Sequence, residues 1–359
     1  MNTSSESSTK PFKLTSLSHG GGCACKLSAK ELATVLKDLP LVDDPRSLID
    51  ASTKDDAAVY QVGDDRAIVA TLDFFTPIVD DAYTFGTIAT ANALSDVYAM
   101  AATPLFALSI VAWPRDPELL PMLNQAMRGG ADVAKQAGIF ILGGHSIDDA
   151  EPKFGMVAIG EVKLSQLISN ANAKVGDLLV LTKPLGTGVM TTGLKRGFIN
   201  EQQLQPAIQS MSKLNADASG VIQLHRDSVH AVTDITGFGL LGHLGNMLEA
   251  SGHSARIDAG SLPVISGVKE LIRSDIIPGG TRRNHEAACL VTNWSDGIAI
   301  EDQFLMTDAQ TSGGLLIAVD PTEMNTFTRS LENAGTLAQA VIGEITARAD
   351  KLVNVVSNS

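Results

Sequence analysis

Residues 84–113 read TFGTIATANALSDVYAMAATPLFALSIVAW, a segment with helical periodicity followed by an apolar run. The spacing of its apolar residues predicts a helix over Thr84–Ala101. The apolar run Leu105–Trp113 lies between Pro104 and Pro114 and is much too short to span a bilayer. It therefore predicts a buried strand.

The residues on either side of this segment extend the same pattern of strands and helices. Before it, two predicted strands flank a Gly63-Asp64-Asp65 turn, and the second runs directly into Asp73. The predicted elements outside the segment are strands Ala57–Val62, Ala67–Leu72, Ile139–Leu142 and Phe154–Val162, and helix Pro117–Ala137, which ends at Gly138.

A polar stretch near Ser165–Gly176 is the best candidate for a domain boundary, because the pattern restarts after it. The later predicted strands are Leu178–Thr182, Ala231–Asp234, Ala255–Asp258, Leu315–Val319 and Ala338–Ile345. The later predicted helices are Val189–Lys195, Gln205–His225 (with Pro206 at its start), Gly239–Ala250, Val268–Ser274 and Pro321–Ala334.

The predicted fold class is therefore α+β, with mixed sheets packed with helices in two domains, 51–165 and 172–350. Residues 1–50 are expected to form a flexible N-terminal arm. Met1–Thr9 is rich in Ser and Thr, and Gly20-Gly21-Gly22 has no side chains to pack.

The charge balance limits the partners that the protein can bind. Lys and Arg number 27 and Asp and Glu number 40, so the formal net charge is −13. A protein this acidic gains nothing from a phosphate backbone by counterion release, which argues against nucleic acid and anionic membranes. Three cysteines favour a reducing compartment over a disulfide framework. With no apolar segment in residues 1–10, we expect a cytoplasmic protein.

Two thiols and a lysine lie together on the glycine-rich arm, in Gly22-Cys23-Ala24-Cys25-Lys26. The ammonium of Lys26 favours the thiolate, which is the nucleophilic form of cysteine. The pair is a poor zinc site by itself, because tetrahedral zinc needs about four ligands. The alternative is two incidental thiols in a mobile tail.

Aspartates recur in apolar or small-residue surroundings at Asp55-Asp56, Asp73, Asp96 and Asp234. Asn92 and Asp96 are four residues apart and therefore share one helix face. Carboxylates at strand ends suit Mg²⁺, which prefers oxygen ligands and substrate phosphates. A single aspartate in such a position is more often a helix cap or a solvated surface carboxylate, and it is the recurrence of several in apolar surroundings that favours a metal site.

Glycine-rich turns occur at Gly143–Ser146, Thr236–Gly239 and Thr311–Gly314, and such turns can bind phosphate through main-chain N–H groups. The chain lacks a P-loop and a dinucleotide fingerprint, so ATP would have to bind without them. His145 lies in the first turn and is a candidate site residue. His243 is interpreted as a packed or capped helix residue.

These motifs, taken in order, resemble the selenophosphate synthetase (selenide, water dikinase) family over about Leu14–Ile345. The matching stretches are SHGGGCACK (18–26), KDDAAV (54–59), DFFTPIVD (73–80), ANALSDVYAM (91–100), GGHS (143–146), TDITGFGLLGH (233–243) and DAQTSGG (308–314). The resemblance implies a fold like aminoimidazole ribonucleotide synthetase and a homodimer with ATP near the subunit interface. It implies conversion of ATP, selenide and water to selenophosphate, AMP and orthophosphate, which supplies selenium for selenocysteine and selenouridine synthesis.

The resemblance also implies roles for single residues. It implies that Cys23 is the catalytic selenium-handling residue and Lys26 its cationic partner, which also contacts the nucleotide. The implied nucleotide contacts are Thr53, Lys54, Asp55, Asp73 and Asp96, with Gly144, His145 and Ser146 contributed by the opposite subunit. The implied ligands of several Mg²⁺ ions are Asp56, Asp96 and Asp234, and a monovalent cation such as K⁺ is left open.

Two other functions remain open at this point. One is another ATP-dependent enzyme of the same fold, such as a hydrogenase-maturation protein, a thiamine-phosphate kinase or a purine-pathway synthetase. These are not expected to carry Cys23-Ala24-Cys25-Lys26. The other is a non-catalytic thiol-based carrier of selenium or metal, which would leave the aspartates without a purpose.

Overall fold

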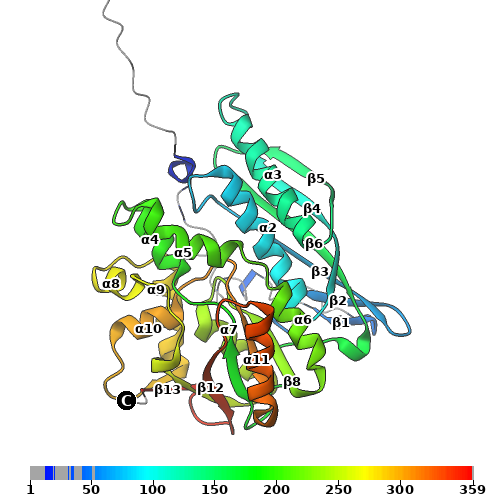
Figure 1. Cartoon of the computed structure of the whole chain (residues 1–359), viewed down its shortest axis with the longest axis vertical. Helices are drawn as coiled ribbons and strands as arrows, with labels where there is room; N and C mark the ends of the chain where they lie inside the picture. The colour runs from blue at the N-terminus through cyan, green and yellow to red at the C-terminus, as the bar shows by residue number, and fades with distance from the viewer. Residues whose placement is uncertain are drawn as a thin grey trace, which may run out of the picture.

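The first half of the chain folds around a mixed sheet with two helices on one face (Figure 1). The fold is a computed structural model that describes residues 13–18, 20, 31, 34–35, 43–50 and 53–357. Within these residues the strand order is β1-β2-β3-β6-β4-β5, and β4 pairs with β5 in parallel. The elements are β1 (Ser47–Ile49), β2 (Ala58–Gly63), β3 (Arg66–Phe75), α2 (Ala82–Ala99), β4 (Thr103–Trp113), α3 (Leu120–Gln136), β5 (Ile141–Asp148) and β6 (Lys153–Val162).

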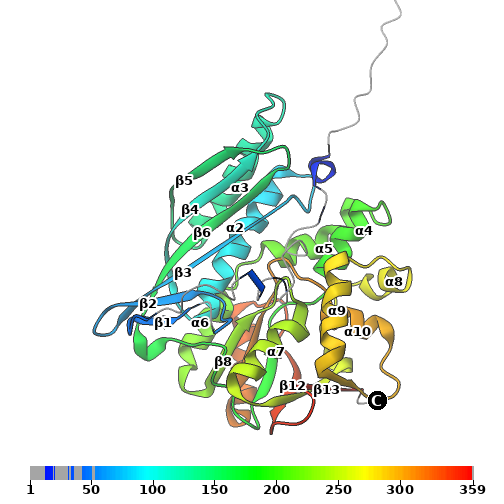
Figure 2. The ribbon, with the colours of Figure 1, turned by 180° about the vertical axis from the view of Figure 1, so that it is seen from behind.

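Side chains alternate between the two faces of this sheet, as the pleat of a strand requires. On β3, Val69 and Asp73 are buried on the helix side, whereas Leu72 and Phe74 are 55% and 45% exposed on the other face. Figure 2 shows that face with β3, β6, β4 and β5 in front of the helices. One face of the sheet is therefore core, and the other is apolar and is not covered by the residues that the structure describes.

Two glycines let α2 and α3 pack closely. A Cβ on Gly86 would lie 1.8 Å from the main-chain oxygen of Ala126, and a Cβ on Gly129 would lie 2.1 Å from that of Tyr83. Any side chain at either position would push the helices apart, so this crossing depends on glycine.

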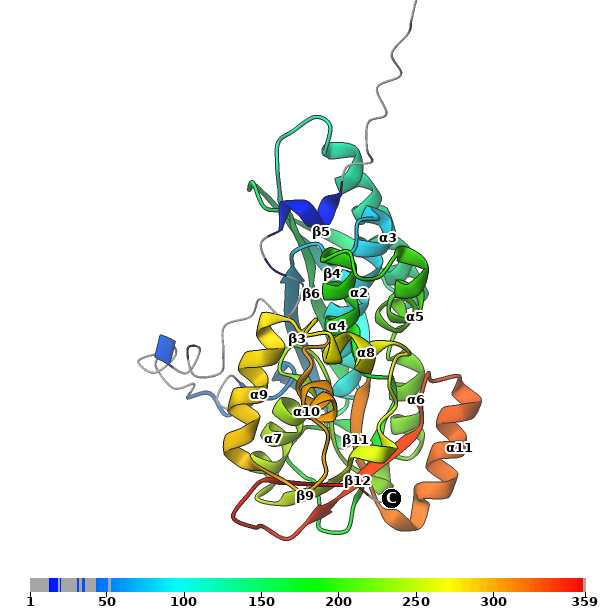
Figure 3. The same ribbon diagram turned by 90° about the vertical axis from the view of Figure 1, so that its left-hand side faces the viewer.

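The second half is a seven-stranded sheet covered on both faces, in the order β10-β13-β9-β12-β7-β11-β8 among the described residues. Figure 3 shows α7, α9 and α10 on one side and α6 and α11 on the other. The strands are β7 (Leu178–Leu181), β8 (Val229–Asp234), β9 (Ser254–Asp258), β10 (Thr292–Trp294), β11 (Leu315–Val319), β12 (Ala340–Thr346) and β13 (Val353–Val356). The helices are α4 (Thr187–Lys195), α5 (Glu201–Ser212), α6 (Ala216–Leu224), α7 (Gly239–Ser251), α8 (Val268–Arg273), α9 (Gly279–Val291), α10 (Ile300–Thr307) and α11 (Met324–Ala334). Short 3-10 helices occur at η1 (Leu14–Leu17), η3 (Leu164–Gln166), η4 (Arg226–Ser228), η5 (Ala259–Ser261) and η6 (Pro321–Glu323).

The predicted strand Leu105–Trp113 is confirmed as part of β4. In the part of the chain that the structure describes, no helix is both long and apolar enough to cross a membrane.

The prediction of one helix over Gln205–His225 is wrong. It is two helices, because the backbone is extended at Lys213 and Asn215 turns its side chain toward Ser95 of α2. Pro206 lies inside α5 rather than at its start.

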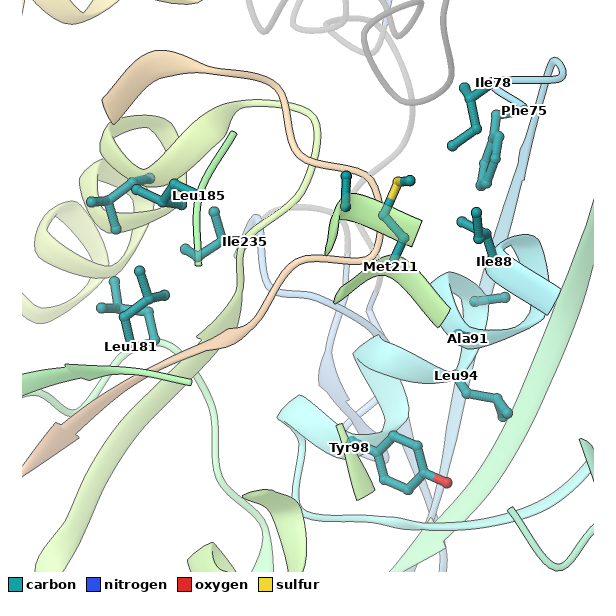
Figure 4. Close-up of a cluster of buried hydrophobic side chains, with 14 of the residues drawn as sticks. Phe75, Ile78, Ile88, Ala91, Leu94, Tyr98, Leu181, Leu185, Met211 and Ile235 are labelled. Carbon is teal, nitrogen blue, oxygen red and sulfur yellow. The ribbon is translucent and has the colours of Figure 1, made fainter. Parts of the chain in front are cut away.

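Helix α2 joins the two halves into a continuous core. Ser219 Oγ and Gln223 Nε2, both on α6, donate to the main-chain oxygens of Tyr98 and Ala101 at 2.9 Å each. Figure 4 shows part of this core, with Ile88, Ala91 and Leu94 from α2 and Leu181, Leu185 and Met211 from the second half. Helix α2 is buried on nearly all sides, which explains why residues 84–99 contain so few charges.

Candidate active site

Two of the three carboxylates predicted to bind metal, Asp56 and Asp234, come together where the loop 53–56 meets the end of β8. Carboxylate oxygens of Asp56 and Asp234 and a ring nitrogen of His243 all lie within 4.8 Å of one another. Thr233, the residue before Asp234, donates from Oγ1 to Asp56 Oδ1 at 2.8 Å. Asp56 Oδ2 is buried and receives no hydrogen bond from the described residues. A buried carboxylate oxygen in this state is suited to a cation.

The pKa shifts of the carboxylates in the cluster also indicate a cation site. Burial raises the pKa of Asp56 well above its usual range, and the charges of Asp234, Asp55 and Asp96 raise it further. Burial also raises the pKa of Asp55 to about 6, although hydrogen bonds from the main-chain N–H groups of Asp56 and Asn170 oppose this. Like charges this close are stable as carboxylates only beside positive charge, so the donor set fits a divalent cation.

Asp73 and Asp96 approach from β3 and α2. Asn92 Nδ2 donates to Asp73 Oδ2 at 2.8 Å, and Thr71 Oγ1 donates to Asp96 Oδ2 at 2.5 Å. The expectation that Asn92 and Asp96 share a helix face is confirmed, because both contact side chains of β3. Asp73, expected at a strand end, lies inside β3, which continues to Phe75.

The turn Thr311–Gly314 touches this region from the second half of the chain. The Ser312 N–H donates to Asn92 Oδ1 at 2.8 Å, and the main-chain oxygen of Ser312 accepts from Lys183 Nζ at 2.9 Å. Burial lowers the pKa of Lys183 to about 7. Ser312 has a φ of 50°, a left-handed conformation that these two contacts help to hold.

Asp308, at the start of the same motif, holds the N-terminus of α4. Its Oδ2 accepts from the N–H groups of Gly188 and Val189 at 3.1 and 3.2 Å, and from Gln310 Nε2 at 2.9 Å. Its Oδ1 accepts from Thr281 Oγ1 at 2.8 Å. Burial raises the pKa of Asp308 to about 6, although these hydrogen bonds act in the opposite direction. The motif thus has a structural role beside its contact with Asn92.

The predicted nucleotide contacts Thr53 and Lys54 are exposed next to the cluster. Lys54 has a φ of 52°, which costs on the order of 1–3 kcal/mol for a residue with a side chain. Lys54 Nζ lies 3.2 Å from Glu249 Oε2, and both side chains are more than half exposed, so this ion pair adds little stability.

The structure does not bring Gly144, His145 and Ser146 to the aspartates of the same chain. They are exposed on β5, which is separated from β3 by β6 and β4, and three strand spacings amount to roughly 14 Å. A Cβ on Gly144 would lie 2.2 Å from the main-chain oxygen of Ser109, so only glycine lets β5 pair with β4 here.

Cys23 and Lys26 lie outside the described residues, as does most of the predicted arm. Sequence reasoning missed two residues at the cluster, His243 and Thr233. His243 is packed, as expected, and its Nε2 accepts from the Thr236 N–H at 3.2 Å, yet it also borders the carboxylates. The neighbouring Thr236–Gly239 turn was the one available signal for His243.

Comparisons with known proteins place this fold. The chain matches AIR synthase related protein, N-terminal domain, over residues 54–162, and AIR synthase related protein, C-terminal domain, over residues 174–355. A thiamine-monophosphate kinase from Stenotrophomonas maltophilia K279a has a similar structure, with a TM-score of 0.64 at 18% identity over 92% of this chain and 96% of that one. HypE of E. coli, a hydrogenase maturation protein, gives 0.59 at 19% identity over 81% and 82%. The predicted fold is confirmed.

Higher identity is found with two bacterial proteins named selenide, water dikinase. The protein from Carboxydothermus hydrogenoformans is 46% identical over 343 residues, covering 95% of this chain and 98% of its own length. The protein from Myxococcus xanthus is 46% identical over 338 residues, covering 94% and 96%. With this identity across nearly the whole of each chain, and with both AIR synthase related domains present, the chain belongs to the selenide, water dikinase family.

Proposed function

We propose that this protein is a selenophosphate synthetase, which converts ATP, selenide and water to selenophosphate, AMP and orthophosphate. The γ-phosphoryl group goes to selenium, and the ADP that remains is then hydrolysed to AMP and orthophosphate. The observation that carries the proposal is the convergence of Asp56 from the first half with Asp234 from the second. The names of the relatives supply the selenium chemistry.

The residues that would hold Mg²⁺ are Asp56, Asp96 and Asp234. When bound, Mg²⁺ neutralises triphosphate charge and orients the phosphates for transfer. The positive charge of Mg²⁺ would also offset the repulsion between the anionic triphosphate and a chain with a net charge of −13. Nucleotide contacts are assigned to Thr53, Lys54, Asp55, Asp73 and Asp96.

Side chains around the cluster keep these groups in place. Thr233 holds one oxygen of Asp56, and Asn92 holds one oxygen of Asp73, so each carboxylate keeps one oxygen in a fixed direction. Cys23 is proposed to handle selenium, and Lys26 to favour its thiolate and contact the nucleotide. A cytoplasmic location suits this role because the thiol must stay reduced.

We also propose a homodimer in which a second copy supplies Gly144, His145 and Ser146 to each site. The sheet face that the described residues leave uncovered supports this, since Leu142 and Ile147 of β5 are 65% and 56% exposed on the same face as Leu72 and Phe74 of β3. Exposed apolar patches of this kind mark protein interfaces. The proposed division of each subunit is an arm, 1–50, and two domains, 51–165 and 172–350.

Phosphorus NMR of the full chain with ATP, Mg²⁺ and selenide tests the reaction. We expect a selenophosphate signal with one AMP formed per selenophosphate. Cys23→Ser and Asp234→Asn should abolish this signal, whereas the matched controls Cys289→Ser and Asp64→Asn, both at exposed positions, should keep it. AMP without selenophosphate, or an active Asp234→Asn variant, would contradict the proposal.

A further inference from the structure

Asn170 lies in the segment that connects the two sheets and contacts the loop 53–56. It is only 1% exposed. Its main-chain N–H donates to Asp55 Oδ2 at 3.2 Å, and its side-chain Nδ2 donates to the main-chain oxygen of Lys54 at 3.1 Å. One residue of the connecting segment thus holds two consecutive residues of the loop that carries Asp56.

The loop has a conformation that needs such support. Lys54 is left-handed, with a φ of 52°, and a residue with a side chain rarely adopts this state. Within the loop, the Thr53 N–H donates to the Asp50 oxygen at 3.2 Å and the Asp56 N–H donates to Asp55 Oδ1 at 3.0 Å. The bond from Asn170 Nδ2 comes from outside the loop and fixes the peptide that follows Lys54.

The connecting segment is itself tied to the strand that carries Asp234. The Val232 N–H of β8 donates to the Ser169 oxygen at 3.2 Å, directly before Asn170. The next residue of β8, Thr233, holds Asp56. The loop is therefore positioned relative to β8 by two residues, with Thr233 acting on the carboxylate and Asn170 on the backbone.

We infer that Asn170 is a positioning residue for the cation and nucleotide site. It holds the loop so that Asp55 and Asp56 stay close to Asp234. The inference rests on the proposed function. Residues that orient metal ligands typically change metal affinity about 10- to 100-fold when removed. An Asn170→Ala variant should therefore bind the metal–nucleotide complex at least about 10-fold more weakly.

The test is a titration of the full chain with Mn²⁺ and a non-hydrolysable ATP analogue, followed by electron paramagnetic resonance of free Mn²⁺. The matched control is Asn172→Ala, because Asn172 is exposed and its side chain donates only to Ser169 Oγ in the described structure. We expect weaker binding for Asn170→Ala and unchanged binding for Asn172→Ala. Unchanged Mn²⁺ affinity in a folded Asn170→Ala protein would overturn the inference.

Asp56→Asn separates this inference from the proposed function. If Asp56→Asn leaves Mn²⁺ binding intact, the proposed metal site itself is wrong. If Asp56→Asn abolishes binding while Asn170→Ala does not change it, the positioning role alone fails.

If Asn170→Ala folds poorly, the milder variant Asn170→Ser is tested in two backgrounds, the parent chain and Lys54→Gly. The Lys54→Gly substitution removes the cost of the left-handed conformation at residue 54, because glycine adopts it freely. In the Lys54→Gly background, Asn170→Ser should weaken Mn²⁺ binding by a smaller factor than it does in the parent. Equal losses in both backgrounds would show that Asn170 does not act through this peptide.

Discussion

Replacing the buried carboxylate Asp308 by Asn should stabilise the protein at neutral pH but not at acidic pH. Asn keeps an oxygen for the N–H groups of Gly188 and Val189, and it carries no charge. Burial raises the pKa of Asp308 from 3.8 to about 6 in the folded protein. The folded state therefore bears an ionisation cost above pH 6 that the unfolded state does not.

The size of this cost follows from the pKa. A rise from 3.8 to about 6 corresponds to about 3 kcal/mol of folding free energy. Between about pH 6 and pH 4, Asp308 is protonated in the folded protein but still largely ionised in the unfolded chain. The parent protein therefore becomes more stable as the pH falls through this range. With about 2.1 cal/mol/K of unfolding entropy per residue, 3 kcal/mol corresponds to about 4 °C for a chain of 359 residues.

Thermal unfolding of parent and variant from pH 4.5 to 8 checks this prediction. The difference in Tm between Asp308→Asn and the parent should become about 3 °C less favourable to the variant as the pH falls from 7.5 to 4.5, because about two thirds of the ionisation cost is lost over this range. The control Asp296→Asn, at an exposed position, should show no such change. Asp308→Ala should lower Tm at every pH, because two buried N–H groups lose their acceptor. A pH-independent difference for Asp308→Asn would refute the assigned cause.

Thr233→Val removes the hydrogen bond to Asp56 and should weaken Mn²⁺–nucleotide binding about 10-fold, measured by calorimetry; unchanged affinity would contradict the role of this bond. Gly144→Ala places a Cβ 2.2 Å from a main-chain oxygen of β4 and should lower selenophosphate formation at least about 10-fold, measured by phosphorus NMR, with full activity as the contrary result. Phe74→Asp should convert the proposed dimer to monomer in sedimentation velocity, whereas Leu224→Asp, 82% exposed on α6, should not; a dimeric Phe74→Asp protein would exclude this face as the interface.

Local pattern was sufficient for much of the fold. The helix over Thr84–Ala101 and the strand over Leu105–Trp113 were predicted because burial leaves each element almost free of charge within its own residues, and the length of each segment separates helix from strand. The break between α5 and α6 was not predicted, since it depends on a hydrogen bond from Asn215 to Ser95, 120 residues away. Helices α9 and α10 and strands β10 and β13 were also missed.

The candidate site divides in the same way. The aspartates could be singled out as candidates because carboxylates in apolar surroundings are unusual and because several motifs occur in family order. The contacts around them could not, since Thr233 and Asp56 are 177 residues apart and Asn170 and Asp55 are 115 apart. No local spacing relates residues at these separations.

The sequence by itself determined the residue types available for chemistry, the α+β class and the position of each carboxylate relative to its own helix or strand. The tertiary structure decided which of them meet. Sheet order, the crossing of α2 between the halves and the path of the segment around Asn170 bring Asp56 to Asp234 and leave Gly144–Ser146 at the opposite sheet edge. The physical reason is that periodicity reports burial within one element, whereas a site depends on how separate elements pack.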